Sequence, residues 1–178
     1  MAATVLIREK NGAGETPTDK TSGTVRLKVA DNATVDNNDP IVIPSSGQNY
    51  SMEKVLRLHI GGTGPDVQIE DLEFYMDGAN GFGTGVKLWA SNESAYTQPG
   101  IPDNANDPPE GPVGASPEAA MVDAFSYTSG SPLSLGAGPY SSINTDMGDY
   151  LYLVMEAEST ATQGATPSET ATFGYNEI

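Results

Sequence analysis

The sequence predicts a mainly β fold: a single antiparallel β-sandwich, jelly-roll-like, with long irregular loops and at most one short helix. Apolar residues recur with period two in about seven short segments, which is the pattern of half-buried strands. Gly 20 and Pro 13 stand beside many Ser, Thr, Asn and Asp residues, which divide a chain into short strands and turns. The length of 178 residues favours one domain over residues 1–178, large enough to bury a core although the chain contains no cysteine.

In the first half of the chain, apolar residues alternate with polar ones at 25–29 and 55–60, and each segment predicts a strand. A third apolar run, residues 67–76, changes phase between Ile69 and Leu72. A one-residue change of phase turns the side chains to the other face of a sheet. We therefore expect a β-bulge near Glu70 and Asp71.

In the second half, residues 86–90, 150–157 and 171–175 alternate in the same way and predict three further strands. The glycine-rich run at 81–85 precedes a strand rather than a helix, so we expect a hairpin turn instead of a phosphate-binding loop. Ser-Pro-Glu at 116–118 is typical of a helix start and predicts at most two helical turns, over residues 119–125.

Three irregular segments separate these elements. Residues 98–121 form a loop with six of the prolines, residues 126–149 are rich in glycine and serine, and residues 8–23 form a polar N-terminal arm. Their composition is close to that of disordered chains. Segments of this kind become ordered mostly when something holds them, so we expect intermolecular contacts.

The charges are distributed unevenly along the chain. The net charge is −16, and all eight basic residues lie within the first 87 positions. One interpretation is that the N-terminal half docks on an acidic partner through Arg8, Lys10, Arg26 and Lys28; the other is that the asymmetry only keeps one end soluble. A chain this acidic repels phosphates, so nucleic acid is not an expected partner.

Neither membrane insertion nor export is expected. No stretch approaches the roughly 20 apolar residues of a membrane span. The opening MAATVLIR lacks the basic region and the apolar core of a signal peptide. We therefore expect synthesis in the cytoplasm, although the composition is typical of proteins that act outside the cell.

The residue types predict no enzyme. His59 is the one histidine, and without a cysteine or a second histidine it has no partners for nucleophilic or metal chemistry, so we expect a surface or cross-strand role. Asp71 and Glu73 share a strand face but lack the aromatic surroundings of a glycosidase cleft. We expect no bound cofactor.

Calcium is the one ion that the sequence suggests. Asp31, Asp36 and Asp39 lie in a stretch rich in Asn, and Asp77 begins a second polar turn. Such oxygen ligands suit Ca²⁺, although neither run has EF-hand spacing. Asp and Asn also stabilise turns through their own side chains, and turns are the favoured interpretation.

Four local patterns resemble one group of proteins. They are EKNGAGET at 9–16, the Ser-x-Glu-Lys-x-x-Arg strand at 51–57, the segment 71–86 with its GTGV ending, and FGYNEI at 173–178. Together they resemble the opening, central strand, following hairpin and closing strand of small structural proteins of tailed-phage virions. The resemblance covers about half of the chain, and the Pro-rich loop has no counterpart in it.

The resemblance implies a β-rich structural component of a bacteriophage virion, most closely a head decoration (capsid cement) protein. Such a protein is made in the host cytoplasm, binds the major capsid protein as a homo-oligomer on the outer head surface, and reinforces the head. A tail or fibre component is the alternative within the virion. An extracellular carbohydrate-binding or adhesion module is the alternative outside it, and would need an exposed aromatic platform, for which the candidates are Tyr75, Trp89, Tyr150 and Tyr152.

Overall fold

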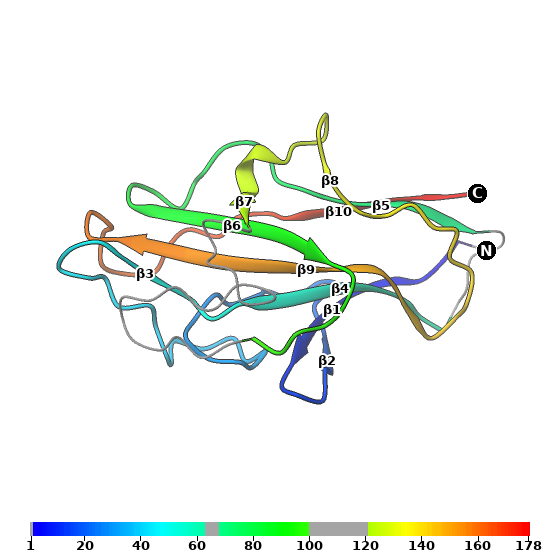
Figure 1. Cartoon of the computed structure of the whole chain (residues 1–178), viewed down its shortest axis with the longest axis horizontal. Coiled ribbons are helices and arrows are strands. Elements are labelled where there is room, and N and C mark those ends of the chain that lie inside the picture. Colours follow the sequence, from blue (N-terminus) through cyan, green and yellow to red (C-terminus); the bar gives the residue numbers. More distant parts are fainter. Residues whose placement is uncertain (1, 63–67, 100–120) are drawn as a thin grey trace.

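The structure, a computed structural model, describes residues 2–62, 68–99 and 121–178. Within these residues the chain forms ten strands and one short 3-10 helix (Figure 1). In chain order the elements are β1 (Val5–Asn11), β2 (Thr16–Asp19), β3 (Gln48–Tyr50), β4 (Lys54–Ile60), β5 (Ile69–Tyr75), β6 (Val86–Glu93), β7 (Val122–Asp123), η1 (Ala124–Ser126), β8 (Leu133–Gly136), β9 (Thr145–Glu158) and β10 (Thr172–Glu177).

The strands form two antiparallel sheets. The larger has the order β2-β1-β4-β9-β6-β7, with β3 also paired to β9, and the smaller has the order β10-β5-β8. Figure 1 shows the longer strands β4, β5, β6, β9 and β10 running along the long axis of the molecule, with the smaller sheet over one face of the larger. The predicted mainly β, antiparallel sandwich with at most one short helix is confirmed.

The 14-residue strand β9 is the centre of the larger sheet. On one side it contributes Leu151 and Leu153 to the inner core, which also contains Leu72 and Phe74 of the smaller sheet. On the other side it contributes Tyr152 to a second apolar cluster, the outer cluster, formed by Tyr50, Val55, Met121, Tyr150, Tyr152 and Val154. The central strands are therefore buried on both faces, as expected for the middle of a covered sheet.

The predicted bulge in the third apolar run is confirmed. Ile69 and Leu72 are both fully buried although they are three residues apart. Asp71 between them has a φ of 51°, and the β5–β10 register shifts between Gly174 and Asn176. The extra residue rotates β5, so that both halves of an out-of-phase sequence face the core.

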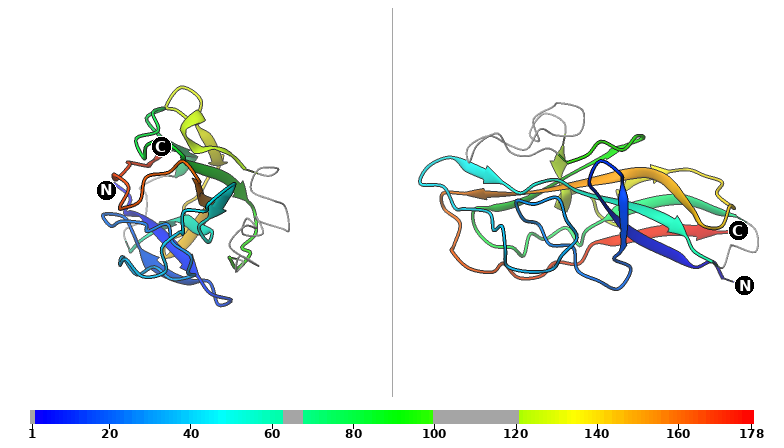
Figure 2. Two further views of the ribbon diagram at one scale, coloured as in Figure 1. Left: turned by 90° about the vertical axis from the view of Figure 1, so that its left-hand side faces the viewer. Right: turned by 90° about the horizontal axis from the view of Figure 1, so that it is seen from below.

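The prediction of a strand at 25–29 is wrong. Residues 20–47 contain no strand; instead they cover the part of the inner face of the larger sheet that lies beside β1 and β4 (Figure 2). Val25 and Leu27 pack against the inner core. Lys28, the next residue along the chain, is also buried. The alternation of residue types was therefore misleading, because the polar member of the pattern also points inward.

Three smaller expectations also differ from the structure. The polar arm at 8–23 carries most of β1 and all of β2 as a hairpin. The run at 81–85 joins β5 of the smaller sheet to β6 of the larger, so it connects the sheets rather than forming a hairpin. Of the expected helix, residues 121–125 form a coil, the two-residue strand β7 and the start of η1. The described residues do not include the expected helix start at 116–120, most of the Pro-rich loop, or Val67 at the start of the third apolar run.

The two ends of the chain lie at the same end of the sandwich (Figures 1 and 2). The backbone N–H of Ala3 donates to the carboxylate of Glu177 at 2.9 Å. The last residue, Ile178, pairs with Gln68 through two backbone hydrogen bonds, which extend the β10–β5 ladder. No helix among the described residues has the length and apolar character to cross a membrane.

Candidate functional site

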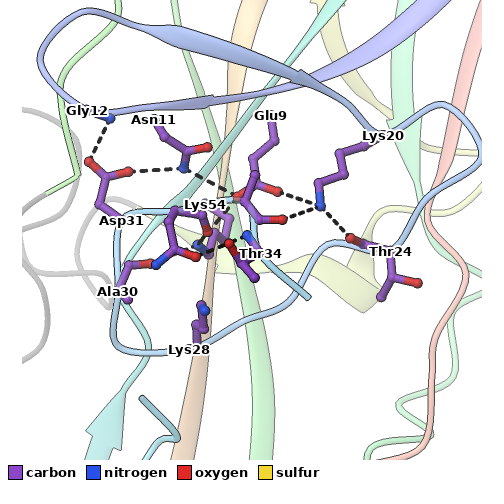
Figure 3. Close-up of polar contacts among 12 residues, drawn as sticks. Glu9, Asn11, Gly12, Lys20, Thr24, Lys28, Ala30, Asp31, Thr34 and Lys54 are labelled. Atoms are coloured by element: carbon purple, nitrogen blue, oxygen red, sulfur yellow. Dashed lines mark hydrogen bonds and ion pairs between the residues drawn. The ribbon is translucent and has the colours of Figure 1, made fainter. Parts of the chain in front are cut away.

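The most unusual feature of the fold is a set of buried charges at the edge of the inner core. Glu9 on β1 and Lys54 on β4 have side chains that are 1% and 0% exposed, and the Lys54 Nζ lies 3.4 Å from the Glu9 Oε1 (Figure 3). The same Oε1 accepts a hydrogen bond from the Asn11 Nδ2 at 3.3 Å. One carboxylate oxygen thus connects an amine on β4 and a carboxamide on β1.

Two further buried lysines, Lys20 and Lys28, lie near this pair, and Lys20 contacts it directly. The Lys20 Nζ lies 3.5 Å from the Glu9 Oε2 and donates to the carbonyl oxygens of Thr24 and Ala33 at 2.9 and 2.7 Å. The Lys28 Nζ donates to the Asp36 carboxylate at 2.8 Å, which holds the pKa of Asp36 below its usual value.

The lysines replace a strand ladder as the means of holding residues 20–47. The Lys54 Nζ donates to the carbonyl oxygens of Ala30 and Asn32 at 2.9 and 2.7 Å, so one ammonium group binds two turns of the segment (Figure 3). The backbone N–H of Val29 donates to Asp39 and closes the loop on itself. Buried carbonyl groups need partners, and here lysine side chains supply them. We call Glu9, Asn11, Lys20, Lys28, Asp31 and Lys54 the buried lysine network.

Burial makes this arrangement energetically costly. Desolvation lowers the pKa of Lys54, and the nearby Glu9 carboxylate opposes that shift. The Glu9 Oε2 is buried and accepts no hydrogen bond, so its ion pair with Lys20 is the main compensation. A buried charge left without its partner is strongly destabilising. The network therefore works as a unit.

A second cluster lies on the opposite face of β1 and β4. The His59 Nδ1 lies 2.7 Å from Asp146 on the neighbouring strand β9, and Lys10 and Arg8 approach the same carboxylate. His59 itself is 4% exposed. Of the two roles expected for His59, the contact with Asp146 on the next strand is the cross-strand one. The surface role is wrong, because the side chain is buried.

The aromatic residues beside this cluster are internal. The guanidinium of Arg57 lies 4.1 Å from the centre of the Tyr150 ring and also donates to its hydroxyl. The Tyr150 hydroxyl donates to Glu15 at 2.7 Å, and desolvation together with this bond raises the pKa of Tyr150 to about 12. Tyr150 and Tyr152 are 5% and 0% exposed. They therefore cannot join Tyr75 and Trp89 in an exposed aromatic platform. The expectation that Tyr150 and Tyr152 bind carbohydrate through such a platform is wrong.

The four residues expected to dock a partner do not form one surface patch. Lys10 and Lys28 are 4% and 1% exposed and are paired inside the fold with Asp146 and Asp36. For these two the docking prediction is corrected: their ammonium groups are used internally. Arg8 and Arg26 are half-buried, and for them docking stays a prediction.

The calcium candidates accept hydrogen bonds from the protein. Asp31 binds the backbone N–H of Gly12 at 2.8 Å and the Asn11 amide at 3.1 Å. Asp36 and Asp77 accept from the backbone N–H two residues on, as in the favoured turn interpretation. Asp39 is exposed in a turn with a φ of 53°. Among the residues that the structure describes, no three carboxylate or imidazole side chains converge on a metal position.

Sequence reasoning missed Glu9, Lys20 and Lys54 as a site. The available signal was the presence of charged residues in apolar strands, at the end of β1 and the start of β4. Comparisons of the chain with protein-family models, with curated proteins and with solved structures find no match.

Proposed function

We propose that this chain is a structural protein of a bacteriophage virion that binds the outer surface of the head as a decoration, or cement, protein. One observation carries the proposal. Two of the four resemblances, EKNGAGET at 9–16 and the Ser-x-Glu-Lys-x-x-Arg strand at 51–57, are far apart in sequence, yet their Glu9, Asn11 and Lys54 meet in the buried lysine network. Motifs that together make one structural unit support a common origin better than separate short matches do.

The distribution of charge also supports action by contact. All eight cationic residues are buried or half-buried. Among the described residues, the charged ones that are exposed rather than half-buried are all acidic: Asp19, Asp39, Asp71, Asp77, Asp123 and Glu177. A surface of this kind attracts a partner with cationic patches and speeds encounter with it. The partner is, on this proposal, the major capsid protein, and the docking charges are carboxylates rather than lysines.

Rigidity is the second structural support. A protein that reinforces a shell must transmit force between its neighbours without deforming. In this chain even the 28-residue stretch 20–47, which has no strand, is fixed to the sheet: Lys54 of β4 donates to two of its carbonyl groups, and its Lys20 pairs with Glu9 of β1. We include in the proposal that the protein acts as a homo-oligomer on the virion, after synthesis in the host cytoplasm.

The test begins with virions of the phage that encodes the chain. A specific antibody should find the protein in purified particles at a fixed ratio to the major capsid protein, and electron microscopy should place it on the head. Location on the tail would replace head decoration by the tail or fibre alternative. Absence of the protein from purified virions would overturn the proposal.

A deletion phage tests the cement role itself. Heads without the protein should assemble but release DNA at lower temperature and after milder osmotic shock, with restoration on adding back the purified protein. Equal survival of both particles would remove the reinforcing role and leave a virion protein of another purpose.

A further inference from the structure

We propose that Lys54 and Asn11 become joined by an intramolecular amide bond, with Glu9 carrying the proton between them. This inference concerns a covalent modification of the chain and does not depend on the proposed function. It rests on the position of three buried side chains: an amine, a carboxamide and a carboxylate that contacts both.

The strand register brings the two reacting residues together. In the antiparallel β1–β4 pair, Lys10 lies opposite Val55, so the next position along both strands places Asn11 across from Lys54. Opposite residues of an antiparallel pair have their Cβ atoms about 5 Å apart and share one face of the sheet. The flexible four-carbon side chain of lysine can span that separation.

Glu9 is in position to transfer a proton. Its Oε1 lies 3.4 Å from the Lys54 Nζ and 3.3 Å from the Asn11 Nδ2 (Figure 3). It can therefore accept a proton from the ammonium group and deliver one to the nitrogen that leaves. Such transfer by a positioned carboxyl group is ordinary general acid–base chemistry.

The surroundings favour the reactive form of each group. Lysine becomes a nucleophile when it loses its proton, and desolvation of the fully buried Lys54 lowers its pKa. The Asn11 Nδ2 also donates to Asp31 at 3.1 Å, so two carboxylates flank it and stabilise positive charge as it becomes protonated. Asn11 is 9% exposed, so water has little access to compete with the amine.

The step balances without any added reagent. Glu9 takes one proton from the Lys54 ammonium, the freed Nζ attacks the Asn11 Cγ, and a C–N bond forms. Glu9 delivers this proton to the departing Nδ2, the Cγ–Nδ2 bond breaks, and ammonia leaves. The new amide nitrogen then gives up its second proton through Glu9 to the ammonia, which departs as ammonium, so that Glu9 ends as it began and no proton is left over. The hydrogen bonds from Lys54 to Ala30 and Asn32 describe the unreacted arrangement, which the amine leaves when it turns toward Asn11.

The decisive measurement is mass spectrometry of the purified, denatured full-length chain. The expected mass is lower than the sequence mass by one ammonia. Trypsin should fail to cleave after Lys54 and should yield one branched species that joins residues 11–20 to residues 29–57. A chain of full sequence mass after prolonged incubation in the folded state would overturn the proposal.

Loss of ammonia alone is insufficient, because Asn11 precedes Gly12 and an Asn-Gly pair can also lose ammonia by forming a succinimide. A succinimide leaves Lys54 free for trypsin and takes up water in mild base, whereas the proposed amide does neither. A mass loss accompanied by normal cleavage after Lys54 would therefore also overturn the proposal.

Variants separate the three roles. Lys54→Arg and Asn11→Ala should show no branched peptide, and Glu9→Gln should greatly reduce it although both reacting groups are present. Lys20→Arg is the matched control, because Lys20 contacts Glu9 but does not lie across from Asn11; its branched peptide should persist. A branched peptide formed equally well in Glu9→Gln would remove Glu9 from the mechanism.

Discussion

The Lys54 side chain has no exposed surface, and it contacts a carboxylate and two carbonyl oxygens that lie on β1 and on segment 20–47. Its charge is therefore solvated by the protein instead of by water. Because the compensating groups come from separate parts of the chain, the residue acts on structure well beyond its own strand. Its loss would leave both Glu9 and the carbonyl groups without a partner.

Relative to the unreacted chain, in which Lys54 keeps its charge, Lys54→Met should consequently destabilise the fold by about 3–5 kcal/mol, the usual cost of breaking a buried ion pair on one side. Urea unfolding measures this as a lower midpoint. Arg26→Met is the control, since the guanidinium of half-buried Arg26 donates a hydrogen bond to the Asn37 side chain at 3.2 Å and has no carboxylate partner in the described structure; it should change stability by less than about 1 kcal/mol. Similar losses in both variants would contradict a special role for the network.

A second prediction at this scale concerns acid. Desolvation raises the pKa of Asp146, but hydrogen bonds from Lys10 and His59 outweigh it and hold the pKa below its usual value. A lowered carboxyl pKa in the folded state stabilises the protein above the unfolded pKa of about 3.9 and loses that effect as pH falls through the folded pKa.

Asp146→Asn should therefore reduce stability near neutral pH and weaken the decline of stability below about pH 4. The measurement is the unfolding free energy at several pH values, with Asp77→Asn, an exposed turn residue, as the control. If the acid limb of Asp146→Asn matches that of the unsubstituted protein, the contacts of Lys10 and His59 do not stabilise the carboxylate.

At the scale of elements, β9 depends on an irregularity near its start. Between Leu56 and Leu58 of β4 the register on β9 jumps from Leu151 to Met147, and Gly148 in this bulge has a φ of 64°. A Cβ at Gly148 would collide with the backbone carbonyl of Leu135 on β8. The glycine thus allows the two sheets to approach each other closely.

Gly148→Ala should destabilise the protein by at least ~2 kcal/mol, because a positive φ and a backbone clash act together. Gly47→Ala is the matched control: Gly47 has a φ of 73°, but a Cβ there would meet nothing within 4 Å. Both variants place a side chain at a positive φ, but only Gly148→Ala also clashes with Leu135. The difference between their losses in melting temperature should therefore measure the cost of the clash. Equal losses for the two variants would show that the approach of β8 contributes nothing.

The sequence predicted elements wherever apolar side chains alone determine the structure. The phase change around Asp71 correctly predicted a bulge, because both halves of β5 must face one core. The predicted strand at 25–29 is absent, because Lys28 occupies the polar position of the pattern and is nevertheless only 1% exposed. The prediction of strands from alternating residues assumes that charged side chains face water. No local pattern in the sequence shows that a carboxylate from a distant segment will form an ion pair with a buried lysine.

The buried lysine network could not be predicted for the same reason. Glu9 and Lys54 are 45 positions apart, and their contact depends on the pairing of β1 with β4, which is a tertiary property. The resemblance singled out both segments but gave no reason to bring them together. The turn roles of Asp36 and Asp77, by contrast, follow from neighbours two residues away and were the favoured interpretation.

For the whole molecule, the dominant property is the excess of negative charge on the outside. A net charge of −16 with every cation at least half-buried means that exposed carboxylates repel one another. Salt reduces this repulsion, because the screening length falls from about 30 Å at 0.01 M to about 8 Å at 0.15 M ionic strength. The ion pairs of the buried network are screened much less.

The melting temperature should therefore rise as NaCl is added from 0.01 to about 0.15 M. The double variant Asp71→Lys/Asp77→Lys, which changes two exposed carboxylates, should show a smaller rise. Differential scanning calorimetry at matched pH measures both. A melting temperature that falls with salt would mean that attractive surface pairs, rather than repulsion, govern the stability of the exterior.

The hydrogen bond between Ala3 and Glu177 has a practical consequence for engineering. Because both ends of the chain leave the sandwich at one pole, peptides fused to either end would be displayed side by side there, and the opposite pole would stay unchanged. A short glycine linker could also join the ends into a circular chain. New ends could then be opened at Gly164, in an exposed connection where a side chain would meet nothing within 4 Å, to give a circular permutant with its fusion sites at a different point on the surface.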